Sequence, residues 1–89
     1  MSSDQRRRLR QDAIWREADG EVIALDDRLT AYVSTNSTGS LLWKQLADGA
    51  SADELAERLV DTFGIEREVA ERDVRTFLAE LDAQGFLQA

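Results

Sequence analysis

Apolar and polar residues alternate along the first third of the chain. From Leu29 to Ser34 every second residue is aliphatic, which is the period of a half-buried strand. Two shorter apolar segments precede it, and Ala18-Asp19-Gly20 and Asp26-Asp27-Arg28 separate the three segments with residues that favour tight turns. The predicted strands are Ala13–Arg16, Glu21–Leu25 and Leu29–Ser34. Successive strands joined by such short turns predict an antiparallel β-meander.

From Asn36 onward the apolar residues recur with the period of a helix. Asn36 suits the N-cap of a first helix that Gly49 closes, with Leu41, Leu42, Trp43 and Leu46 on its apolar side. Ser51 and Glu54 have the spacing of a capping box, which predicts the start of a second helix. Gly64 is expected to end this helix after Leu55, Ala56, Leu59, Val60 and Phe63.

A third and longer helix is predicted from Arg67 to Gln84, before Gly85. Its buried stripe is expected to be Ala70, Val74, Phe77, Leu78 and Leu81. Three strands followed by three helices, without crossover connections, exclude a parallel α/β unit. The predicted fold class is therefore α+β, a three-stranded antiparallel β-meander followed by three α-helices in a winged helix-turn-helix-like arrangement.

Length and charge refine this picture. The 89 residues suffice for one small domain, which we place at residues 12–89 after a flexible basic tail at residues 1–11. Residues 1–10 hold four arginines and one aspartate, or +3, so the rest of the chain carries −7 − 3 = −10. No apolar run follows the arginines, so we expect neither a secretory signal nor a membrane span, and a cytoplasmic protein.

The sequence contains no cysteine and no histidine. This removes thiolate nucleophiles, imidazole bases and the usual zinc ligands. The 18 acidic residues are spread over amphipathic segments, a distribution more typical of a solvated surface than of a metal or glycosidase site. We therefore expect no catalytic residues, no metal and no cofactor.

The order and spacing of several motifs carry a family resemblance. They are Val22-Ile23-Ala24-Leu25-Asp26, Tyr32 before Asn36-Ser37-Thr38-Gly39, Leu42-Trp43, an Asp-Gly before the capped helix, Asp73-Val74 with Phe77-Leu78 and Leu81, and Gly85-Phe86-Leu87. In this arrangement the chain resembles the PqqD-like family over nearly its whole length. The resemblance implies a recognition element, or peptide chaperone, for ribosomally synthesised and post-translationally modified peptides (RiPPs).

As the resemblance implies it, the leader region of a precursor peptide adds as an antiparallel strand to the third strand, in a groove bounded by the third helix. The implied partners are that leader and a leader peptidase or other modifying enzyme. In its compact length, this chain is most similar to the recognition partners of lasso-peptide pathways. The alternative within the family is a peptide carrier for a radical enzyme in quinone-cofactor synthesis.

The residues themselves are compatible with such a site. The third strand ends the meander, so one of its edges has no sequential neighbour, and the third helix has a mixed apolar and polar line beside its buried stripe. The candidate peptide-binding residues are Leu29, Thr30, Ala31, Tyr32, Val33, Ser34, Val69, Asp73, Thr76 and Phe77. Val69 and Phe77 are equally compatible with the core, where we also expect Trp43, whereas Trp15 fits either face of its strand.

Two other functions fit parts of the pattern. A winged-helix outline is typical of DNA-binding regulators, but six acids outnumber three arginines between Ile65 and Gln84. Such a helix would repel phosphates, so we expect no nucleic-acid partner. A purely structural subunit, whose free strand edge pairs with a second copy or a partner enzyme, is also compatible with the sequence.

Overall fold

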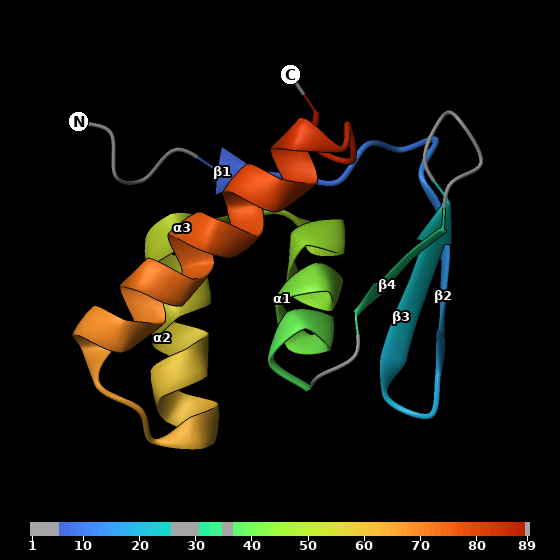
Figure 1. Cartoon of the computed structure of the whole chain (residues 1–89). Helices are drawn as coiled ribbons and strands as arrows, with labels where there is room; N and C mark the ends of the chain where they lie inside the picture. Colours follow the sequence, from blue (N-terminus) through green and yellow to red (C-terminus); the bar gives the residue numbers. More distant parts are fainter. Residues whose placement is uncertain (1–5, 26–30, 35–36, 89) are drawn as a thin grey trace.

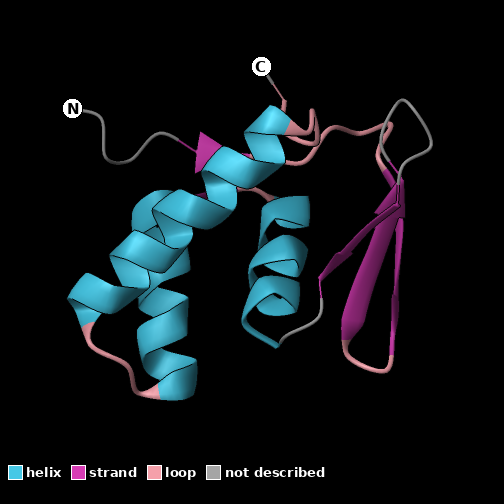
Figure 2. Cartoon of the chain, viewed as in Figure 1, coloured by secondary structure: helices cyan, strands magenta, loops and turns pink. Residues whose placement is uncertain are grey.

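A computed structural model describes residues 6–25, 31–34 and 37–88 of the chain (Figure 1). The elements are β1 (Arg6–Arg7), β2 (Ile14–Ala18), β3 (Glu21–Leu25), β4 (Ala31–Ser34), α1 (Ser37–Asp48), β5 (Ala50–Ser51), α2 (Ala52–Phe63) and α3 (Arg67–Ala83). Figure 2 shows the three helices on one side of the domain and the sheet of β2, β3 and β4 on the other. Helix α1 lies between this sheet and α2, while α3 crosses over the helices.

The meander forms as predicted, with strand order β2-β3-β4. Asp19 and Gly20 both have positive φ, 54° and 82°, which is the geometry of a two-residue hairpin turn. On β3, Val22 and Ala24 are buried while their neighbours are half-buried or exposed, so one face of the sheet packs against the helices. The predicted turn at Asp26-Asp27-Arg28 lies outside the described residues.

The predicted helix signals are also confirmed where the structure describes them. The Ser51 hydroxyl accepts from the Glu54 amide, the Glu54 carboxylate accepts from the Ser51 amide, and α2 begins at this capping box. Gly64 ends α2 in the left-handed conformation with φ 68°. The first predicted N-cap, Asn36, lies outside the described residues, and α1 is observed from Ser37.

Trp43 is the centre of a single apolar core. Its side chain is fully buried, and its ring lies edge-to-face with Trp15 of β2 at 5.8 Å and with Phe86 at 5.2 Å between ring centroids. All five residues of the predicted α3 stripe are buried in the same core. The Ser40 hydroxyl donates to the carbonyl oxygen of Gly20 at 2.7 Å and joins α1 to the hairpin.

The N-terminal segment differs from the expected flexible tail. Arg6 and Arg7 form β1, which pairs with β5, and Leu9 is only 4% exposed in the core. The Arg10 amide donates to the Phe86 carbonyl at 2.8 Å, and the Gln88 amide donates to the Arg8 carbonyl at 2.9 Å. The tail prediction is therefore wrong for residues 6–10, because one buried leucine and backbone pairing hold them on the domain.

None of the helices in the described ranges is both long enough and apolar enough to cross a membrane.

Candidate functional site

The sheet has two outer strands, β2 and β4, and the residues at their edges differ in charge. In the described part of the chain each of them pairs only with β3. The central residues of β2 include Arg16 and Glu17, and Glu17 accepts from the Lys44 ammonium at 3.1 Å. Strand β4 has the sequence Ala-Tyr-Val-Ser and carries no charge. Charged residues on an edge discourage strand pairing, so β4 is the edge better suited to accept another strand.

The register of β4 defines which backbone groups remain available. Val33 lies opposite Ile23 and Tyr32 opposite Ala24 in an antiparallel pair. In such a pair, alternate residues direct their amide and carbonyl groups toward the partner strand and the others direct them outward. Two of the four residues of β4 therefore present backbone groups at the free edge.

The second part of the candidate site lies on α3. Val69 is half-buried, Asp73 and Thr76 are exposed, and Phe77 is 8% exposed as part of the core. Residues three or four positions apart lie on the same face of a helix. By this spacing one line of residues runs beside the buried stripe, and we call this line the α3 margin: Val69, Asp73, Thr76 and Glu80. Phe77 therefore offers a partner little surface, while Asp73, Thr76 and Glu80 of the α3 margin are exposed.

The opposite side of α3 is already in use. The Arg7 guanidinium of β1 lies 3.8 Å from the Asp82 carboxylate, and Arg67 lies 3.6 Å from Asp53 of α2. Helical spacing places Asp82 on the other side of the buried stripe from Asp73. The α3 margin therefore lies on the side of the buried stripe away from Asp82 and β1, and its contact with a ligand is a prediction.

The structure thus places the described candidates in two groups on separate elements. Ala31, Tyr32, Val33 and Ser34 form β4, and Val69, Asp73, Thr76 and Phe77 share adjoining faces of α3. Leu29 and Thr30 lie outside the described residues. That the outer edge of β4 and the α3 margin together form the peptide-binding site remains a prediction.

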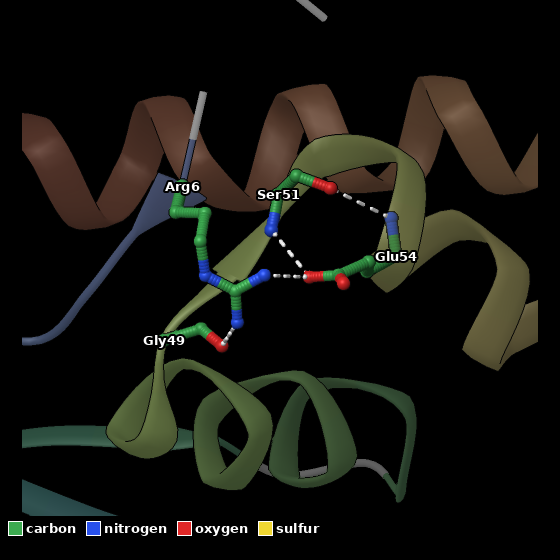
Figure 3. Close-up of polar contacts among 4 residues, drawn as sticks. All are labelled: Arg6, Gly49, Ser51 and Glu54. Atoms are coloured by element: carbon green, nitrogen blue, oxygen red, sulfur yellow. Dashed lines mark hydrogen bonds and ion pairs between the residues drawn. The ribbon is translucent and has the colours of Figure 1, made fainter. Parts of the chain in front are cut away.

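A polar cluster that sequence reasoning missed joins β1 to the start of α2 (Figure 3). The Arg6 guanidinium donates to Glu54 Oε1 at 2.9 Å and to the Gly49 carbonyl at 2.6 Å. The Ser51 amide donates to the same Oε1 at 3.0 Å. This hydrogen bond is the main cause of the lowered pKa of Glu54, and the hydrogen bond from Arg6 is the next cause. Arg6 and Glu54 are 48 residues apart, so no local pattern indicates this contact. The cluster anchors the N-terminal segment.

The open depressions lined by described residues include three with volumes of about 410, 360 and 610 Å³. The first two adjoin along α1 and α2 at Gln45, Asp48 and Arg58, and the third lies beside Arg10 and Leu87. None of the three includes a candidate peptide-binding residue.

Among the residues that the structure describes, no group of three or more metal-ligating side chains comes together.

These features define the class of protein: a small winged-helix-like α+β domain with an uncharged free strand edge. The family described as coenzyme PQQ synthesis protein D (PqqD) matches residues 21–87, from β3 to beyond α3. The chain belongs to this family. No curated protein gives a significant match over the chain.

Two solved structures have the same fold. TbiB1 in complex with the TbiA(beta) leader peptide is 24% identical, with a TM-score of 0.84 over 92% of this chain and 95% of that chain. A lasso peptide synthetase B1 complexed with the leader peptide is 27% identical, with a TM-score of 0.79 over 93% of this chain and 98% of that chain. The predicted fold class is confirmed by these likenesses, and the predicted family by the match to PqqD.

Proposed function

We propose that this protein binds the leader region of a RiPP precursor peptide by strand addition at β4 and presents it to processing enzymes. The observation that carries the proposal is the uncharged outer edge of β4. The structural neighbours of this domain, which were solved with leader peptides, support it. The protein itself acts without catalysis, as a cytoplasmic adaptor. The absence of histidine and cysteine from the sequence supports that role.

The energetics favour a peptide with side-chain anchors over backbone pairing alone. Two outward-facing residues offer about four backbone groups, and each hydrogen bond contributes a net ~0.5–1.5 kcal/mol, or about 2–6 kcal/mol together. Micromolar affinity needs about 8 kcal/mol, and each large apolar side chain buried adds ~1.5–3 kcal/mol. A leader that also packs side chains against α3 reaches this affinity.

The structural neighbours support a product class. Both were solved in complex with a leader peptide, and one is named a lasso peptide synthetase B1, so a lasso-peptide leader peptidase is the processing enzyme that we propose. The family description favours a second candidate, a PqqD-type carrier that presents its peptide to a radical enzyme in quinone-cofactor synthesis. Binding assays against the precursor leaders of both pathways separate these candidates.

The proposed function is tested by titrating the protein with the synthetic leader of the precursor gene nearest to its own gene. Calorimetry should give a dissociation constant of roughly micromolar or below. Amide shift changes should concentrate at Thr30–Ser34 and Val69–Phe77. Changes centred on Ser51–Phe63 would place the site elsewhere, and no saturable binding to any such leader would refute the proposal.

Strand addition itself is tested on the peptide, so that the fold of the protein stays unchanged. Single backbone N-methylation removes one N–H donor, and in an added strand only alternate amides face the partner strand. Binding should therefore fall at every second position of the leader and persist at the positions between. A Val33→Pro variant should also lose binding, because proline removes a donor or distorts β4, and circular dichroism checks its fold. Glu57→Ala on α2 serves as the control.

A further inference from the structure

We infer that the peptide site selects a leader segment carrying lysine or arginine, with Asp73 as the residue that faces the cation. The inference rests on the proposed function and adds to it the chemistry of the ligand. It arises from the charges on the two proposed walls of the site, β4 and the α3 margin.

The walls of the site carry negative charge only. Strand β4 has no residue that is charged at neutral pH, and the α3 margin contributes the carboxylates of Asp73 and Glu80. Both are exposed, and neither forms a salt bridge within the described part of the chain. The acids elsewhere on α3 are partly neutralised, since Asp82 pairs with Arg7 and Glu71 accepts from Arg67 at 3.0 Å.

The arginines of α3 do not compensate for the charge of the margin. Arg67 is engaged with Asp53 and Glu71 at the start of the helix. Helical spacing places Arg75 on the side of Asp82. Arg72 is exposed and borders the margin, three residues from Val69 and four from Thr76, but in the described part of the chain it forms no salt bridge with Asp73 or Glu80. The margin therefore carries two carboxylates without a salt bridge, on a body of −10.

These charges discriminate between leaders. An acidic segment laid against α3 would meet two carboxylates without counter-ions, whereas a cationic segment would gain one or two ion pairs there. Asp73 and Glu80 are seven residues apart, or about 10 Å along a helix axis, and a strand covers that distance in about three residues. The fitting segment therefore has a cation opposite Asp73, and a second cation two to four residues away improves the fit.

The test uses the synthetic leader of the nearest precursor gene, titrated against wild type, Asp73→Asn and a matched control, Glu57→Gln. Both variants remove one exposed carboxylate from a helix, but Glu57 lines the depression beside Arg6. Asp73→Asn should weaken binding by about twofold to fivefold, as for an exposed ion pair, and reduce its salt dependence. Glu57→Gln should leave the affinity within the error of the titration.

The cation is then found by changing each lysine or arginine of the leader to glutamine in turn. One of these substitutions should weaken binding to wild type and have no effect on binding to Asp73→Asn, which identifies the pair. A leader that binds wild type but is unaffected by Asp73→Asn, or whose binding segment holds no lysine or arginine, overturns the inference while leaving strand addition intact. A leader that does not bind at all defeats the proposed function and this inference with it.

Discussion

Replacing Leu9 by alanine measures whether the N-terminal segment belongs to the folded domain. Leu9 is 4% exposed, its amide donates to the Leu46 carbonyl at 3.1 Å, and it forms a bridge with Leu87. Leucine-to-alanine changes in a core cost ~2–5 kcal/mol, through lost burial and the cavity left behind. We expect a loss at the low end of this range, about 2–3 kcal/mol, because the segment that carries Leu9 is held by short backbone pairings.

This loss is large for a domain of this size. Folded domains have a free energy of unfolding of ~0.05–0.15 kcal/mol per residue, or about 4–13 kcal/mol for a chain of this length. A loss of 2–3 kcal/mol should lower the melting temperature by about 8–24 °C, since small domains shift by ~4–8 °C per kcal/mol. Urea titration monitored by tryptophan fluorescence measures it directly, because Trp43 is fully buried.

The control is Gln11→Ala, which changes an exposed residue of the same segment and should stay within about 0.5 kcal/mol of wild type. A Leu9→Ala variant equally close to wild type would refute the reasoning. It would mean that residues 6–10 contribute nothing to the cooperative core and behave as the flexible tail that composition alone suggests.

Three further outcomes are expected. Ser51→Ala should lower the free energy of unfolding by about 1 kcal/mol in urea, because α2 loses its N-cap; an unchanged midpoint would contradict the capping role. The lowered pKa of Glu54 means that its stabilisation is present above the ordinary value of 4.5 and is lost as pH falls through the lowered pKa. The difference in urea midpoint between wild type and Glu54→Gln should therefore shrink with acidification, and a constant difference would argue against it. Double-stranded DNA should not bind at physiological ionic strength, and a mobility shift at low protein concentration would reverse that expectation.

Local sequence signals predicted most of the fold. Ser51 and Glu54 are three residues apart, Asp19 and Gly20 are adjacent, and the stripe of α3 repeats within one helix, so each signal lies within a short window. The order of the strands followed from their short connections. These features depend on neighbouring residues, and a single sequence contains the information needed to place them.

Features formed by distant residues were not predictable in this way. Strand β1 has two arginines and no apolar alternation, and its two residues pair with Ser51 and Ala50 of the two-residue strand β5, which is distant in the sequence. The isolated Leu9 gave no periodicity to indicate burial. The candidate site could be predicted only in part. The sequence predicted that β4 is an outer strand and that Asp73 lies beside the buried stripe of α3. Which side chains contact a peptide depends on how these separate elements pack together.

The pairing of residues 8–10 with residues 86–88 has a consequence for synthesis of the protein on the ribosome. The hairpin of β2 and β3 joins neighbouring residues and can form early, whereas Leu9 meets Leu87 across almost eighty residues of chain. Contacts of such separation form late, because the intervening chain must be ordered first. Residues 8–10 therefore pair with residues 86–88 only after α3 has been made, whereas Arg6 and Arg7 can pair with β5 earlier. The docking of residues 8–10 on residues 86–88 marks the completion of the domain.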